Sequence, residues 1–111
     1  MSINVWIKCG KVLDILKDAT TTATGEWHYK DGLNSTYQAI LSGTGALTAT
    51  VIIEVSNDGV NACSTPLGTI VLSGTTLTSD GFTSSAPWKY VRARISAISG
   101  TNATIDVNTG V

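Results

Sequence analysis

Residues 46–60 constrain the fold of this chain more than any other part of its sequence. Apolar side chains occupy every second position from 47 to 55, so an extended strand here has one apolar and one polar face. Asn57, Asp58 and Gly59 follow at once, and an Asp-Gly pair tolerates the positive φ angles that tight turns require. The pattern predicts a half-buried β-strand that ends in a turn. Its inward residues are predicted to be Leu47, Ala49, Val51, Ile53 and Val55.

The same alternation recurs along most of the chain. The segment 11–17 also has apolar residues at helical spacing, and a strand is the favoured interpretation there. In the segment 88–97, the alternation puts Val91, Ala93, Ile95 and Ala97 on one face. Further strands are predicted over residues 3–9, 11–17, 26–30, 37–41, 67–73, 76–82, 88–97 and 103–107.

The triplet Ser-Gly-Thr occurs three times, at 42–44, 73–75 and 99–101, each time where an alternating apolar run stops. We interpret the triplets as turns. The connection at 42–45 is short, so the strands on either side of it are expected to pair antiparallel. The unequal spacing of the triplets excludes a solenoid or propeller repeat.

With 111 residues, of which 42% are hydrophobic and 14% charged, the chain has the size and composition of one globular domain. Many short strands separated by turn residues are typical of a sandwich. The sequence therefore predicts an all-β fold, a single-domain jelly-roll β-sandwich of about 7–8 antiparallel strands. The domain spans residues 1–111, and residues 1–24 form its N-terminal segment.

Charge and hydropathy exclude two classes of partner. The formal net charge is -1 and basic residues are not clustered, whereas nucleic-acid binding needs clustered Lys and Arg. The N-terminus has neither the basic start nor the apolar run of a signal peptide, and no apolar stretch reaches membrane-spanning length. We expect synthesis in the cytoplasm and no nucleic-acid or membrane partner.

Residues that carry chemistry are sparse. The single histidine, His28, shares a predicted strand face with Glu26 and Lys30, which is typical of an exposed, solvated side chain. The carboxylates include no close pair suited to a glycosidase or a metal cage, and the ligands of a calcium loop are missing after Asp58. The chain is predicted not to be an enzyme and to bind no metal or cofactor. Cys9 and Cys63 are predicted to be free, largely buried thiols, with a disulfide as the alternative.

Aromatic and basic residues leave several interpretations open. Core or inter-sheet packing is favoured for the four aromatic residues Trp27, Tyr29, Trp88 and Tyr90, with protein contact and sugar stacking as alternatives. Arg92 and Arg94 share one strand face, which is either a solvated face or a site for an acidic group of a protein partner.

Three stretches of the chain resemble a known family. TYQAILSGTGALTATVIIEVSNDG, LGTIVLSGT and APWKYVRARISAISGTNATIDV look like the small jelly-roll structural proteins of tailed bacteriophages. Within that group the chain resembles the capsid decoration, or staple, proteins of epsilon15-like short-tailed phages, whose length is also similar. The resemblance implies a fold similar to carbohydrate-binding modules. It also implies a non-enzymatic role on the outer surface of an icosahedral capsid, where paired copies clamp adjacent capsomers of the major capsid protein.

On this basis the chain is expected to be a virion protein that stabilises the capsid and acts as a homodimer. Trp6, Ile7 and Lys8 are predicted to contact the capsid, because an aromatic and a charged residue lie opposite an aliphatic row. Tyr90, Arg92 and Arg94 are predicted to form the dimer contact. A phage tail or baseplate component, or a carbohydrate-binding receptor module, is the alternative function.

Overall fold

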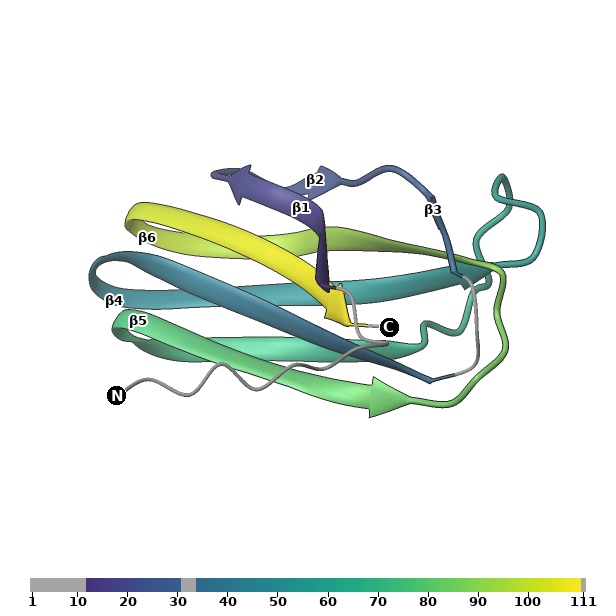
Figure 1. Ribbon diagram of the computed structural model, residues 1–111. Helices are drawn as coiled ribbons and strands as arrows, with labels where there is room; N and C mark the ends of the chain where they lie inside the picture. The colour runs from purple at the N-terminus through teal and green to yellow at the C-terminus, as the bar shows by residue number, and fades with distance from the viewer. Residues whose placement is uncertain (1–11, 31–33, 111) are drawn as a thin grey trace, which may run out of the picture.

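The computed structural model describes residues 12–30 and 34–110, and these residues contain β-strands and no helix (Figure 1). The strands are β1 (Val12–Ala19), β2 (Ala23–Thr24), β3 (His28–Tyr29), β4 (Ser35–Ser56), β5 (Gly68–Ser84) and β6 (Tyr90–Gly110). Their order is β1-β6-β4-β5, with β2 and β3 also paired to β6, and every pair is antiparallel. The predicted all-β, antiparallel fold is confirmed. A helix long and apolar enough to cross a membrane is not found in these residues.

Three strands, β4, β5 and β6, are long and bend near their middles (Figure 1). The register of β4 against β5 shifts between Ser42 and Ala46, where β4 bends. Four residues near the bends have positive φ angles, a conformation that is easiest for glycine: Gly45, Thr76, Gly100 and Asn102. Because neighbouring strands bend at the same level, one sheet folds over into two layers.

The Ser-Gly-Thr triplets lie at these bends, so their interpretation as turns between paired strands is wrong. Residues 37–41 and 46–56 are two halves of β4, and the pairs described for each half are with β5 and β6. The buried apolar residues of both halves have odd numbers, so the same face stays inward across the bend. A jelly roll of 7–8 strands is not confirmed, because several of the predicted strands are halves of the long bent ones.

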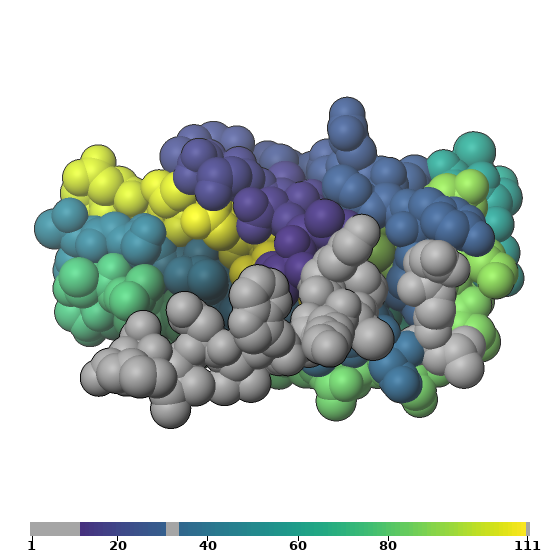
Figure 2. All heavy atoms as spheres, viewed as in Figure 1, coloured from purple at the N-terminus to yellow at the C-terminus, as the bar shows by residue number. Residues whose placement is uncertain are grey.

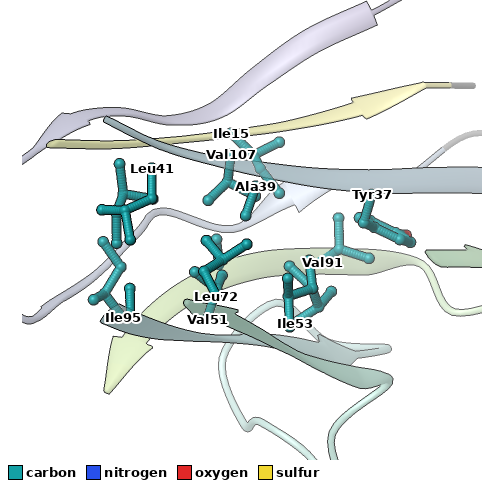
Figure 3. Close-up of a cluster of buried hydrophobic side chains, with 14 of the residues drawn as sticks. Ile15, Tyr37, Ala39, Leu41, Val51, Ile53, Leu72, Val91, Ile95 and Val107 are labelled. Carbon is teal, nitrogen blue, oxygen red and sulfur yellow. The ribbon is translucent and has the colours of Figure 1, made fainter. Parts of the chain in front are cut away.

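The core lies between the two layers (Figure 3). All five inward residues predicted from 46–60 are at most 3% exposed, which confirms that assignment. Tyr37, at the start of β4, is also buried, and its hydroxyl accepts a hydrogen bond of 2.9 Å from Ser35 Oγ. Both layers contribute side chains to this core. One layer contributes Ile15, Tyr37, Ala39, Leu41 and Val107, and the other contributes Val51, Ile53, Leu72, Val91 and Ile95.

Leu47 is buried where β4 bends, in space left free by two glycines. A Cβ atom at Gly43 would lie 2.8 Å from Cδ2 of Leu47 and 2.8 Å from the carbonyl oxygen of Thr101. A Cβ at Gly100 would lie 2.5 Å from the same Cδ2. Glycine at both positions therefore allows the bends of β4 and β6 to close around this leucine.

A bulge in β6 corrects one further prediction. Thr50 pairs with Ala97 while Val51 pairs with Ile95, so β6 has one extra residue between them. Ala97 is therefore exposed, and the next residue, Ile98, packs against the core in its place.

We predict that Leu47→Ala lowers the free energy of unfolding by about 2–5 kcal/mol. The substitution leaves a cavity between the backbones of β4 and β6, which cannot move together to fill it. Urea denaturation measures the change. The matched control is Leu13→Ala, on a half-exposed leucine of β1, which should cost less than about 1 kcal/mol. Equal losses for the two variants would contradict the role assigned to Leu47.

Candidate interaction surface

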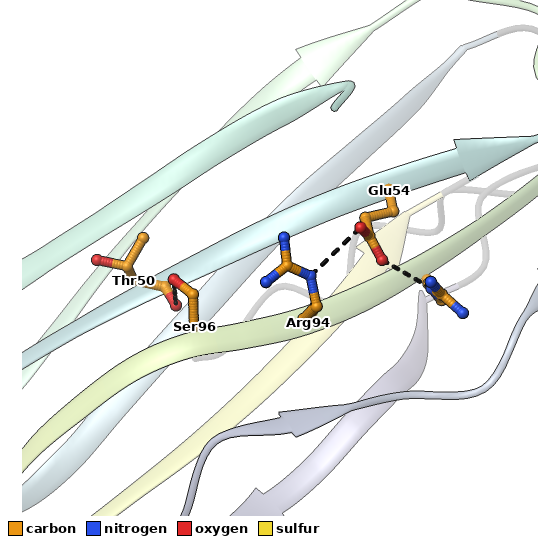
Figure 4. Close-up of polar contacts among 5 residues, drawn as sticks. Thr50, Glu54, Arg94 and Ser96 are labelled. Carbon is orange, nitrogen blue, oxygen red and sulfur yellow. Dashed lines mark hydrogen bonds and ion pairs between the residues drawn. The ribbon is translucent and has the colours of Figure 1, made fainter. Parts of the chain in front are cut away.

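The predicted dimer contact residues Tyr90, Arg92 and Arg94 all lie on the outward face of β6. Glu54 lies opposite Arg92 in the register of β4 and β6. Its Oε1 is 2.8 Å from Nε of Arg92 and its Oε2 is 3.2 Å from Nε of Arg94, so one carboxylate bridges both guanidinium groups (Figure 4). The Glu54 side chain is 13% exposed, which places these charge-assisted hydrogen bonds largely out of water. The charges of both arginines are thus already partnered within the chain.

Trp27 covers this charge cluster. It lies between β2 and β3, which both pair with β6. The Cζ atom of Arg92 is 4.3 Å from the centroid of the Trp27 ring, a cation–π arrangement. Core packing was the favoured interpretation for Trp27, and it is wrong, because the indole contacts the outward-facing guanidinium. For Trp88, which packs against the core, the interpretation is confirmed.

Tyr29 and Tyr90 form an aromatic pair beside the charge cluster. Their ring centroids are 5.6 Å apart at 75°, the edge-to-face geometry that aromatic pairs favour. Gly59 lies against the Tyr90 ring, since a Cβ atom at this glycine would be 3.2 Å from it. Tyr90 is therefore held by a neighbour from β3 and by a loop, while Tyr29 remains 63% exposed. Core packing is wrong for these two tyrosines as well.

The loop that contacts Tyr90 is braced by the carboxylate of Asp58. Its Oδ1 accepts hydrogen bonds from the Ser56 hydroxyl at 2.6 Å and from the backbone N–H groups of Val60 and Asn61 at 2.9 and 2.8 Å. Its Oδ2 accepts one from Nδ2 of Asn61 at 2.8 Å. The Ser56 hydrogen bond first, and then those from residues 60 and 61, hold the pKa of Asp58 well below its usual range. The predicted turn at Asp58-Gly59 is confirmed, with φ of 69° at Gly59.

Val60 adds exposed apolar area next to Gly59, the residue that lies against the Tyr90 ring. It follows the braced turn and is 74% exposed. Residues around β3 (blue) and the connection after β4 (teal) come together at the right-hand end of the molecule in Figure 2. We define the Tyr29 surface by six residues at this end: Trp27, Tyr29, Val60, Lys89, Tyr90 and Arg92.

Positive charge gathers at the same end. Four of the five Lys and Arg residues in the described part of the chain lie there, the exception being Lys17 on β1. Lys30 donates its backbone N–H to the carbonyl of Lys89 at 2.6 Å. It was predicted on an exposed face, yet it is only 4% exposed, and burial, followed by the nearby charge of Lys89, lowers its pKa. His28 on the same predicted face is half-buried. Aromatic, aliphatic and cationic side chains together are typical of a protein-binding surface.

Groups suited to catalysis are not gathered at this surface. Across residues 12–30 and 34–110, no cluster of three His, Cys, Asp or Glu side chains is placed to hold a metal ion. His28 borders a hollow that is also lined by Asp14, Lys17 and Glu26, none of which belongs to the Tyr29 surface. The absence of enzymatic activity stays a prediction.

The predicted capsid contact, Trp6, Ile7 and Lys8, lies outside the described residues, and so does Cys9. Cys63 has a free, half-buried thiol that packs against the core. The dimer contact predicted at Tyr90 and the two arginines stays a prediction too.

Glu54 is the central residue of this surface, and it was not singled out from the sequence. The available signal was that two strands carry opposite charges on their polar faces, Glu54 on one and Arg92 and Arg94 on the other. That signal becomes informative only when the pairing of the two strands is known, because opposite charges stabilise a sheet when they face each other across it.

Comparison with known proteins supports the fold. No family model matches the chain, and no curated protein matches its sequence. The crystal structure of the SPBc2 prophage-derived protein YomS has a similar fold, with a TM-score of 0.67. The match covers 99% of this chain and 98% of that one, at 12% sequence identity. Identity this low establishes a shared fold and leaves the activity of the chain to be argued separately.

We predict that Glu54→Gln lowers the free energy of unfolding by about 1–3 kcal/mol, because two partly buried guanidinium groups lose their counter-charge. Thermal or urea unfolding at neutral pH measures the loss. Asp14→Asn is the matched control: its pair with Lys17 spans 3.8 Å between largely exposed side chains, so its removal should cost below about 0.5 kcal/mol. A loss no greater than in the control would show that Glu54 does not organise the cluster.

A second prediction concerns pH. Since the folded-state pKa of Asp58 is lowered, its carboxylate stabilises the fold above about pH 4, where the unfolded chain is also ionised, and this contribution declines as pH falls toward the folded pKa. Asp58→Asn should therefore unfold at lower urea concentration than wild type at pH 7. The two midpoints should converge as the pH is lowered below about 4. A gap that is independent of pH would contradict the role of the carboxylate.

Proposed function

We propose that this protein is a non-enzymatic structural protein of a tailed bacteriophage. In this proposal it decorates the outer surface of the capsid and stabilises it by binding adjacent capsomers of the major capsid protein. The Tyr29 surface supplies a contact with the shell.

The observation that carries the proposal is the match in fold, over nearly the full length of both chains, to a protein derived from a prophage. The resemblance of three stretches of sequence to phage decoration proteins points to the same class independently. The match supports a phage origin, and the sequence resemblance supports the place on the capsid.

The Tyr29 surface suits attachment to a rigid partner. Tyr90 is held by Tyr29 and by the Gly59 turn, and Asp58 braces that turn from within. A surface that is ordered before binding loses less conformational entropy when the complex forms. Exposed Tyr29 and Val60 then offer apolar area that is removed from water on contact.

Stabilisation of a capsid by such a protein follows from linkage. A protein that binds the expanded shell and not the precursor shell favours the expanded state by the difference in binding free energy. Individual contacts can be weak, because a protein that engages two capsomers gains from the high effective concentration of its second contact. No bond is made or broken in this mechanism.

The test uses expanded capsids of the phage that encodes the chain, stripped of this protein and mixed with the purified chain. We expect saturable binding, and we expect Tyr29→Ala to weaken it by about tenfold or more, because truncating an interface tyrosine costs roughly 2 kcal/mol. Val12→Ala is the control, since Val12 is 72% exposed on β1 and outside the Tyr29 surface.

Three outcomes would count against the proposal. Binding to purified tails or baseplates and not to shells would favour the tail component, and binding to a glycan array would favour the receptor module. Equal shell binding by the Tyr29 and Val12 variants would remove the Tyr29 surface from the contact. A chain that lacks residues 1–9 tests the separate prediction for Trp6, Ile7 and Lys8, which requires that its binding to shells be lost.

A further inference from the structure

We propose that β5 is an assembly edge, at which a second copy of this chain adds its own β5 as an antiparallel strand. The inference is independent of the proposed function, because it rests on the sheet alone. In the described residues, β5 is the last strand in the order β1-β6-β4-β5 and pairs with β4 only. That pairing runs from Gly68 to Ser84, so among the residues described the other side of β5 presents backbone hydrogen-bonding groups along both layers, although the N–H of Gly81 already donates to Oδ1 of Asp80 at 2.8 Å.

The two strands at the ends of the order β1-β6-β4-β5 differ in charge. β1 carries three charged residues among its eight, Asp14, Lys17 and Asp18, and its pairing with β6 is interrupted by two register shifts. β5 has 17 residues with a single charge, Asp80, and it contains no Lys, Arg or Pro. Charges, proline and irregular pairing are the features by which proteins protect an edge from further strands. β1 has this protection along its length, and β5 has it at Asp80 alone, which is on the inward face opposite the buried Ala39.

Exposed apolar side chains on β5 also favour the addition of a strand at this edge. Leu77, just after the bend, is 63% exposed, and Val71 is 66% exposed. Both belong to a strand whose other outward residues are mostly Ser and Thr. Exposed apolar side chains on an open edge are removed from water when another strand is added there.

One register makes β5 complementary to itself. If Leu77 of one copy lies opposite Leu77 of the other, residues at equal distances before and after position 77 face each other. Leu72 then lies opposite Phe82, and Asp80 lies opposite Gly74, where no side chain crowds the carboxylate. All these pairs join residues of equal parity, so the inward face of one copy continues the inward face of the other.

This register also keeps the two negative charges apart. The second β5 runs in the opposite direction to the first. Residues 68–75 of one copy, before the bend, therefore pair with the half of β5 after the bend in the other copy. The two Asp80 carboxylates consequently lie in opposite layers of the joined sandwich. A two-fold interface that placed them together would instead be opposed by their repulsion.

The bends already present in the molecule show how a further bent strand is accommodated. β6, β4 and β5 bend at the same level, and each remains antiparallel to its neighbour on both sides of the bend (Figure 1). A β5 strand from a second copy would add to the series β6, β4, β5 as one more antiparallel strand that bends at the same level. The two-fold axis then runs from the bends toward the opposite end of the molecule, so the Tyr29 surfaces of both copies point the same way.

The experiment measures mass in solution by sedimentation equilibrium. We expect a dimer for the wild type, and for Leu77→Lys a dimer dissociation constant raised about tenfold or more, because two ammonium groups then meet at the two-fold axis. Leu13→Lys on β1 is the matched control and should dimerise as the wild type does. Since Leu77 and Leu13 are both at least half exposed, circular dichroism should report folded protein for both variants.

Crosslinking tests the register. In a chain with Cys9→Ser and Cys63→Ser, Leu77→Cys should form a covalent dimer on mild oxidation, since residues directly opposite in an antiparallel pair approach disulfide distance. Val12→Cys in the same background should not.

Two results would overturn the inference. A wild-type monomer whose β5 amides are protected from hydrogen exchange would mean that the edge is covered within one chain. A dimer that resists Leu77→Lys and is disrupted by Arg92→Glu with Arg94→Glu would place the contact on the outward face of β6 instead.

Discussion

Where β4 bends, Leu47 packs into space that exists because residues 43 and 100 have no side chains. The three long strands are hydrogen-bonded to one another on both sides of the bend, so none of them can bend at a different level from its neighbours. One local packing contact therefore determines where the sheet folds over and which residues form its two layers. It also places the chain connections 57–67 and 85–89 together at the far end, where the Tyr29 surface forms.

That surface depends on polar contacts that compensate for the charges they bring together. Glu54 offsets two arginines, Trp27 covers one of them, and Asp58 satisfies the donors of a turn that would otherwise rely on water. Side chains engaged in this way are poor candidates for new ion pairs with a partner. What the surface offers is exposed aromatic and aliphatic area on a rigid support, and such area contributes to binding mainly through the removal of water.

Most strands, their inward faces and the turn at Asp58-Gly59 could be predicted from the sequence, because alternation with a period of two is a local property. The bends could not, since a Ser-Gly-Thr triplet is equally compatible with a hairpin and with a bent strand. The difference lies in which strands pair. The Ala97 bulge and the Glu54 cluster were missed for the same reason, because both are defined by the register between residues more than 35 positions apart.

The unequal edges of the sheet would also limit the size of the proposed assembly. Pairing through β5 uses the unprotected edge of each copy and joins the two by a two-fold axis, so the interface is closed. The edges that remain are formed by β1 and by the two-residue strands β2 and β3, all of which pair with β6. β1 carries three charges, and its pairing with β6 is irregular. Further strands find no regular edge there, and growth into fibres is disfavoured. If β5 pairs as proposed, a sheet with one open and one protected edge is therefore expected to form a dimer and not a polymer.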